Sequence, residues 1–220
     1  MDKRKFLLAA GAAAASLPAL AANKRRAAAK PGDRKGARAA ASGQAAEPAA
    51  APKSAGQPAI LTLAGQVGRS NRGPSDDALD QLMHKHGVRF DKAWTLSLAD
   101  LLRLPATTIR TTLEYDGRVH ELSGPQLALA LGMAKVDVNA GLRLVMRAVD
   151  GYSPSLPVAE ARARGMILAT HLDGKPLALG GLGPLWAVYE ADSQPDLRDK
   201  PLNERYAACP WGLYFIDVVA

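Results

Sequence analysis

Several segments of this 220-residue chain alternate apolar and polar residues, and this alternation constrains the fold more than any other feature of the sequence. A period of two is the pattern of a β-strand that buries one face. The clearest example is 109–115, where Ile, Thr, Leu and Tyr alternate with Arg, Thr and Glu. We therefore expect Tyr115 to point inward at the end of a strand. Asp116-Gly117, a pair that tolerates positive φ, is expected to form a two-residue hairpin turn.

Short helices are expected between the strands. Ser97 and Asp100 have the spacing of a capping box, and the leucines that follow run into Pro105, which cannot continue a helix. Gly124-Pro125 is expected to begin another helix. Further helices are expected at 78–86 and 157–165, and strands at 60–67, 109–115, 118–122, 142–148, 166–171, 184–191 and 213–219. These elements predict a mixed α+β domain that is dominated by sheet.

The first 58 residues differ in composition from the rest of the chain. Residues 1–22 combine a basic start, an apolar run and a small-residue cleavage sequence, which predict an export signal peptide. Its start also resembles a twin-arginine signal, so two export routes stay open. Residues 23–58 are rich in Ala, Lys, Arg, Gly and Pro and lack aromatic residues, which predicts a disordered linker. The folded domain is therefore expected over 59–220.

The distribution of charge argues against nucleic acid as a partner. Residues 1–58 carry 11 Lys and Arg against 3 acids, whereas residues 59–220 carry 17 against 18. A nucleic-acid surface needs basic residues clustered on the folded domain, and a nearly neutral domain does not provide them. His84 and His86 are interpreted as surface residues and not as metal ligands, because positions two apart on a helix do not face each other.

Four blocks in the second half of the chain occur in a fixed order. They are Asp150-Gly151-Tyr152-Ser153, then 155–157, then 168–177, then Gly183-Pro184-Leu185-Trp186. This ordered set resembles the oxidoreductase molybdopterin-binding domain, the pterin-holding fold of sulfite oxidases and their bacterial periplasmic relatives. The resemblance covers about 61–219. It implies a sulfite-oxidase-type fold, a pterin such as molybdopterin as the cofactor, and a periplasmic location.

The resemblance directs attention to side chains at strand ends and in the loops that join them. A pterin is a flat heterocycle, and its pocket needs an aromatic or guanidinium face for stacking and a carboxylate for its nitrogens. By resemblance, Tyr152 matches the tyrosine that approaches the metal and substrate in sulfite oxidases. For Trp186 and Tyr189, a place in the core of the sheet is an equally open interpretation. The candidate pterin-binding residues are Tyr115, Asp116, Arg118, Asp150, Tyr152, Ser153, Trp186, Tyr189 and Trp211.

The metal-binding cysteine of that family is missing from its expected place. The resemblance puts this cysteine shortly before a glycine near the middle of the domain, where the chain has Tyr115 two residues before Gly117. A phenol does not readily replace a soft thiolate as a ligand for molybdenum, so we expect no molybdenum and no catalytic residue here. Cys209 is the single cysteine of the chain, so an intrachain disulfide is excluded. Its thiol is the remaining candidate ligand for the metal.

The stretch 183–192 has the sequence Gly-Pro-Leu-Trp-x-Val-Tyr followed by an acidic turn. It resembles a branch of the superfamily that lacks the cysteine and binds a reduced pterin without catalysis. Members of that branch control the periplasmic domain of a membrane-bound cyclic-di-GMP enzyme, so the resemblance implies a signalling protein. Two alternatives stay open, a molybdopterin-dependent oxidoreductase with an atypical metal ligand and an interaction scaffold without a ligand.

Overall fold

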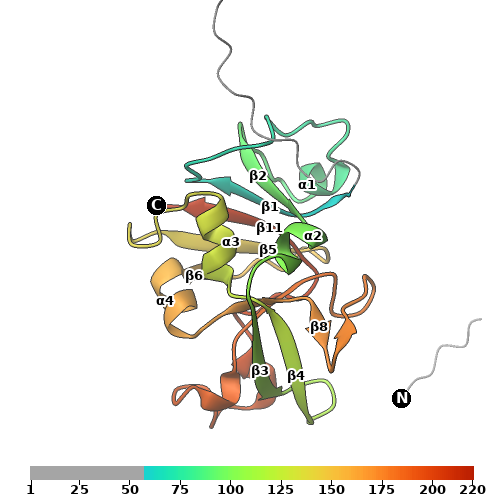
Figure 1. The fold of residues 1–220 in the computed structure, drawn as a ribbon, viewed down its shortest axis with the longest axis vertical. Coiled ribbons are helices and arrows are strands. Elements are labelled where there is room, and N and C mark those ends of the chain that lie inside the picture. The colour runs from blue at the N-terminus through green and yellow to red at the C-terminus, as the bar shows by residue number, and fades with distance from the viewer. Residues whose placement is uncertain (1–56) are drawn as a thin grey trace, which may run out of the picture. The chain divides into compact units, whose positions relative to one another are not determined.

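A five-stranded sheet is the largest element of the computed structural model, which describes residues 57–220 (Figure 1). Its strand order is β2-β1-β11-β5-β6, with β1 and β11 parallel and the other neighbours antiparallel. The two parallel strands are the first and last of the domain, so the sheet joins its two ends. The strands are β1 (Ala59–Gly65), β2 (Ala93–Ser97), β5 (Arg143–Ala148), β6 (Ser155–Pro157) and β11 (Leu213–Val219).

Two smaller sheets complete the β structure. An antiparallel sheet has the order β3-β4-β8-β9, and its β3–β4 hairpin extends away from the main sheet (Figure 1). A separate antiparallel pair is formed by β7 and β10. The strands are β3 (Ala106–Thr112), β4 (Val119–Pro125), β7 (Ile167–Ala169), β8 (His171–Leu172), β9 (Lys175–Pro176) and β10 (Trp186–Val188).

Short helices connect these strands. Ser97 and Asp100 form the expected capping box before α2, because each side chain accepts the backbone N–H of the other residue. No helix within residues 57–220 has the length and apolar character that a membrane crossing requires. The helices are α1 (Gln81–Lys85), α2 (Leu98–Leu102), α3 (Leu127–Met133), α4 (Val158–Ala163), the 3-10 helix η1 (Ala191–Ser193) and α5 (Leu202–Arg205).

The larger of two core clusters packs against one face of the five-stranded sheet, and a smaller one contains Ala64, Met83, Val88, Ala93, Tyr214 and Phe215. Leu61 and Leu63 of β1, Leu144 of β5 and Ile216 of β11 are fully buried in the larger cluster, at alternate positions of their strands. Each such side chain contributes about 1.5–3 kcal/mol when it leaves water, so the alternation in the sequence specifies the register of the sheet. The prediction of a mixed, sheet-dominated α+β domain is confirmed.

The strand expected at 109–115 lies three residues earlier in the structure, at Ala106–Thr112. β3 ends at Thr112, and Leu113 and Arg118 close a four-residue turn, in which the Leu113 N–H donates to the Arg118 carbonyl at 2.9 Å. Tyr115 therefore lies in the turn and not on the strand. Its side chain is 55% exposed, so the expectation that it points inward is wrong.

Three other boundaries differ from the expectations. Gly124 and Pro125 belong to β4, where they pair with Thr107 and Ala106, and the following helix begins only at Leu127. The expected strands 166–171 and 184–191 are interrupted, and only their central residues pair in the β7–β10 sheet. The turn at Asp173-Gly174 is confirmed, since both residues have positive φ between β8 and β9. The expected signal peptide and linker lie outside the described residues, apart from Gln57 and Pro58.

Candidate functional site

Two exposed tyrosines, Tyr115 and Tyr152, contact the same short segment of the chain, 206–212. Tyr115 is held in the β3–β4 turn, and its phenol lies near the indole N–H of Trp211. Tyr152 follows β5, and its hydroxyl donates a hydrogen bond to the Ala207 carbonyl at 2.5 Å. Side chains from the ends of two different sheets therefore meet at segment 206–212, which leads into β11.

The Tyr115 hydroxyl is protonated at neutral pH. Partial burial of its phenol raises the pKa to about 12, and hydrogen bonding to Glu114 and the negative charges of Glu114 and Asp150 act in the same direction. The Trp211 indole N–H opposes this rise. A neutral phenol can both donate and accept a hydrogen bond, but it is not the anionic oxygen that would serve as a metal ligand.

Asp150 is exposed and already oriented by the backbone. Its Oδ1 accepts the Tyr152 N–H at 2.9 Å, and the Tyr152 carbonyl accepts the Ala148 N–H at 2.9 Å. The second carboxylate oxygen, Oδ2, has no hydrogen bond with another residue of 57–220. This oxygen can therefore accept from a ring or amino N–H of a bound molecule next to the half-exposed Tyr152 ring.

Trp186 and Tyr189 lie beneath segment 206–212 and support it. Both are buried, with the Trp186 indole N–H donating to the Cys209 carbonyl and the Tyr189 hydroxyl donating to the Arg205 carbonyl, each at 2.9 Å. Trp211 is half-buried and forms a backbone bridge with Trp186. The core interpretation therefore holds for Trp186 and Tyr189, which position the site without presenting a face to a ligand.

The remaining candidates lie at the rim. Asp116 stabilises its own turn, since its Oδ1 accepts the Arg118 N–H at 3.0 Å, and its Oδ2 lies 3.0 Å from His120 Nε2. Arg118 and Ser153 are exposed, and neither side chain has a hydrogen-bond partner within the described part of the chain. The structure thus leaves Arg118 and Ser153 available to a ligand and assigns Asp116 to the turn.

Three residues that the sequence did not single out hold the turn in place. Asp192 of η1 accepts the Thr112 N–H and hydroxyl, both at 2.7 Å, and also the Arg205 guanidinium at 2.9 Å. The Tyr206 hydroxyl donates to the Thr112 carbonyl at 2.6 Å. The contacts with Thr112 join residues 80 and 94 positions apart, so local spacing in the sequence cannot predict them. The acidic turn after 183–189 was the only visible signal.

A histidine fixes the opposite side of the same turn. His120 on β4 lies between two carboxylates, with Nδ1 2.7 Å from Asp173 Oδ2 and Nε2 3.0 Å from Asp116 Oδ2. Hydrogen bonds to Asp173 and then to Asp116 raise the pKa of His120. This arrangement, which we call the His120 clamp, ties the β3–β4 turn to the β8–β9 turn.

The residues do not fit a molybdenum ion bound through sulfur. Cys209 is 3% exposed, and burial raises the pKa of its thiol to about 12, which disfavours the thiolate that binds metals. Within residues 57–220, no group of three or more His, Cys, Asp or Glu side chains could hold a metal ion. Exposed aromatic rings beside an accessible carboxylate instead fit the ring and the polar edge of a pterin.

Comparison with known proteins gives likenesses among solved structures only. No protein-family model matches the chain, and no curated protein matches it in sequence. Among solved structures, the sulfane dehydrogenase SoxCD from Paracoccus pantotrophus is similar, with a TM-score of 0.46 and 16% sequence identity. The match covers 72% of this chain and 37% of that chain, so the chain spans little more than a third of its length. This likeness is distant, and no functional argument rests on it.

Proposed function

We propose that this protein is a periplasmic pterin-binding protein that does not catalyse a reaction and signals to the periplasmic domain of a membrane-bound cyclic-di-GMP enzyme. The observation that carries the pterin site is the meeting of Tyr115 and Tyr152 at segment 206–212. The periplasmic location and the signalling partner rest on the resemblance of the sequence alone.

The ring of the pterin would stack on an exposed tyrosine. Tyr115 and Tyr152 are 55% and 48% exposed, and they are the exposed aromatic side chains of the described residues. Single exposed apolar residues are common, whereas two exposed aromatic rings at one segment of the chain are less ordinary. Tyr115 lies beside the half-buried Trp211 and Tyr152 beside Ala207, and each ring keeps an exposed part on which a planar ligand can stack.

The polar edge of the pterin would meet Asp150. Its Oδ1 is held by the Tyr152 N–H, so the carboxylate has a fixed direction before any ligand binds. A carboxylate that keeps one free oxygen can accept from the amino group and an adjacent ring N–H of a pterin. The neutral Tyr115 hydroxyl adds a donor and an acceptor to the same rim.

We propose the absence of catalysis because of the protonation of the two candidate metal ligands, Tyr115 and Cys209. The Tyr115 phenol and the Cys209 thiol both have a pKa raised to about 12, so both are protonated at neutral pH. Neither offers the anionic donor that would bind molybdenum through oxygen or sulfur.

The test combines analysis of the native protein with a titration. The full chain is purified from the periplasm, and bound molybdenum and pterin fluorescence are measured. The apoprotein is then titrated with biopterin and with tetrahydrobiopterin. Pterin without molybdenum supports the proposal, pterin together with molybdenum supports the oxidoreductase, and the absence of both pterin and binding supports the scaffold.

Variants locate the site. Asp150→Asn keeps the shape of the side chain but removes its charge, and we expect it to weaken biopterin binding about tenfold, as loss of a charged hydrogen bond does. Leu179→Ala is the matched control, because Leu179 is 73% exposed and lies outside the site. Equal affinity in Asp150→Asn and the wild type would remove Asp150 from the site.

A further inference from the structure

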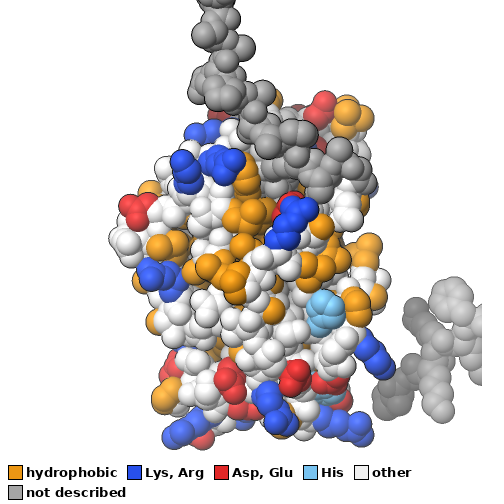
Figure 2. Space-filling model, viewed as in Figure 1, with side chains coloured by type: hydrophobic (Ala, Val, Ile, Leu, Met, Phe, Trp, Pro, Cys, Tyr) orange, Lys and Arg blue, Asp and Glu red, His pale blue; other side chains and the backbone are white. Residues whose placement is uncertain are grey.

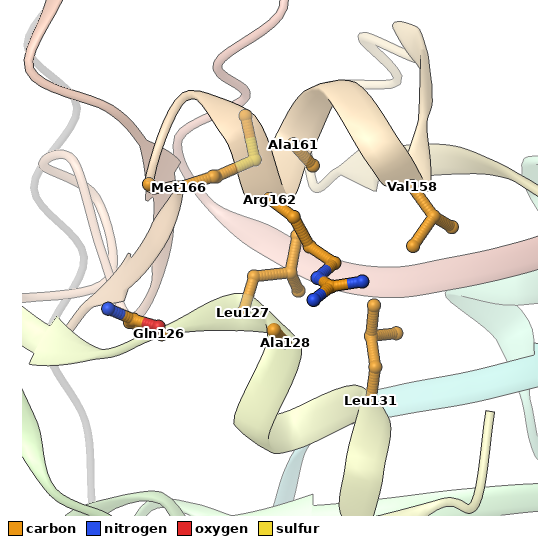
Figure 3. A pocket seen from close by; sticks show the side chains of 9 residues that line it. Gln126, Leu127, Ala128, Leu131, Val158, Ala161, Arg162 and Met166 are labelled. Carbon is orange, nitrogen blue, oxygen red and sulfur yellow. The ribbon is translucent and has the colours of Figure 1, made fainter. Parts of the chain in front are cut away.

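A groove between α3 and α4 is separate from the tyrosine site and has its own chemistry. It has a volume of about 230 Å³, and Leu127 and Leu131 of α3 face Val158 and Ala161 of α4 across it (Figure 3). These four side chains are at most 2% exposed, so the floor of the groove is apolar and closed. We call it the α3–α4 groove.

One positively charged side chain, that of Arg162, lies in this groove. Figure 3 shows the Arg162 side chain extending from α4 into the space between the helices, with its guanidinium toward Leu131. Its Nη1 donates to the Asn139 side-chain oxygen at 3.0 Å. The guanidinium has five N–H donors, so this single bond leaves most of them available.

Arg162 has no carboxylate partner among residues 57–220, although acids lie close in the sequence. Glu160 and Asp196 both pair with Arg164, at 2.9 Å and 2.8 Å. Asp137 accepts the Asn139 N–H at 3.0 Å and so holds the loop that carries the Arg162 partner. The fold therefore pairs Arg164 with two carboxylates, whereas Arg162 is exposed and keeps its charge accessible to a ligand at the groove.

We propose that the α3–α4 groove binds a small amphipathic carboxylate, whose carboxyl group pairs with Arg162 and whose apolar part lies in the groove between α3 and α4. A cavity of about 150 Å³ lined by apolar residues accommodates benzene, so this groove has room for one ring or a chain of about six carbons and its carboxylate. A guanidinium binds a carboxylate through two parallel hydrogen bonds, which fixes the orientation of the ligand.

An exposed apolar surface lies on α2 and on α3, one of the two helices that form the groove. Figure 2 shows apolar side chains gathered across the middle of one face, over α2 and α3, with Lys and Arg side chains at its border. Leu98, Leu102 and Leu129 are exposed in these two helices. The charged side chains at the β3–β4 end form a separate region of the same face (Figure 2).

The test compares acids with their neutral amides. Hexanoate, benzoate, hexanamide and benzamide are titrated into the full-length protein and followed by calorimetry or by the NMR signals of the ligand. Both acids are expected to bind with dissociation constants of roughly millimolar or below, given their few atoms. Each amide is expected to bind at least tenfold more weakly, because it lacks the charge-assisted pair.

Two variants place the ligand. Arg162→Gln removes the charge, and we expect hexanoate to bind about tenfold more weakly while hexanamide is unaffected. Ala128→Leu adds volume to a residue that lines the groove, and it should abolish binding of both. Arg110→Gln, an equal change of charge at an exposed position of β3, is the control and should bind hexanoate like the wild type.

Several outcomes overturn the proposal. They are no binding by either acid, equal affinity for acid and amide, or unchanged hexanoate binding in Arg162→Gln or in Ala128→Leu. A thermal melt of each variant shows that it is folded before the titration is interpreted. Biopterin binding is measured on the same samples and should not change in Arg162→Gln, which separates this site from the proposed pterin site.

Discussion

At the scale of single residues, substitutions of Tyr152 distinguish a ring that contacts a ligand from a side chain that only stabilises the fold. Its ring is half-exposed, whereas its hydroxyl is bound to the Ala207 carbonyl. Tyr152→Ala should weaken biopterin binding at least fivefold, because an aromatic contact contributes about 1 kcal/mol beyond the area it buries. Tyr152→Phe keeps the ring and loses only the hydrogen bond, so it should retain affinity and lose about 1 kcal/mol of unfolding free energy.

Thermal melts and biopterin titrations of both Tyr152 variants distinguish a role in ligand binding from a role in stability. If Tyr152→Ala lowers the melting temperature strongly and leaves the biopterin affinity unchanged, the side chain is structural and the site assignment fails.

The His120 clamp gives a pH dependence with a defined sign. The pKa of His120 is raised above its ordinary value of 6.5 by hydrogen bonds to Asp173 and Asp116. The clamp therefore stabilises the fold fully below pH 6.5, and this contribution is lost as pH rises through the raised pKa. The pKa of each carboxyl is lowered from 3.8, Asp116 chiefly by His120 and Asp173 chiefly by the Glu121 N–H, so their contribution is lost as pH falls through the lowered values.

His120→Gln provides the measurement. Melting temperatures of the wild type and the variant should differ most between pH 3.8 and pH 6.5, the ordinary carboxyl and imidazole values. The difference should shrink at alkaline pH, where the wild-type imidazole is neutral. A difference that stays constant across the whole range would show that the imidazole charge does not hold the two turns together.

At the scale of elements, the sequence specified the strands better than the turns. The alternation in 142–148 predicted β5 almost to the residue, because burial on one face requires it, and the expected strand at 213–219 coincides with β11. The same alternation continued through Tyr115 although β3 ends at Thr112. The strand ends there because Asp192 and Tyr206, far away in the sequence, bind the Thr112 backbone. The alternation of apolar and polar residues does not depend on such long-range contacts, so the position of Tyr115 could not be predicted from it.

The helix expected from Gly124-Pro125 is a second example, and it leads to a prediction. A methyl group on Gly124 would lie 1.9 Å from the Leu168 carbonyl oxygen, so the glycine lets β4 approach the backbone of β7. Gly124→Ala should therefore cost about 3 kcal/mol or more of unfolding free energy, since backbone must move to accept the methyl group.

Gly132→Ala is the matched control for that substitution. Gly132 lies within α3, and a methyl group there meets nothing within 4 Å. Alanine in a helix interior is favoured over glycine by about 1 kcal/mol, so this variant should be slightly more stable than the wild type. Denaturant unfolding of both variants measures the two changes in unfolding free energy. Similar stability of Gly124→Ala and Gly132→Ala would show that the close approach of β4 and β7 is not needed.

At the scale of the whole molecule, the class of fold could be predicted, whereas the function stays a prediction. Strand alternation and short helices sufficed for a sheet-dominated α+β domain, because those patterns reflect burial. The candidate site was harder, since exposure and not residue type distinguishes Tyr115 and Tyr152 from the supporting Trp186 and Tyr189. Aromatic residues look alike in a sequence whether they stack on a ligand or fill a core.

The division between tail and domain is itself testable. The first strand starts at Ala59 and pairs with β2 and β11, and its buried residues begin at Leu61. Residues 23–58 contain no aromatic residue that could extend the core. A chain that begins at Ala59 should therefore melt within about 2 °C of the protein that begins at Asn23, a shift that corresponds to less than about 1 kcal/mol for a domain of this size. The two chains should also bind biopterin equally. A drop in melting temperature well beyond this range would mean that residues before Ala59 pack on the domain and contribute to its stability.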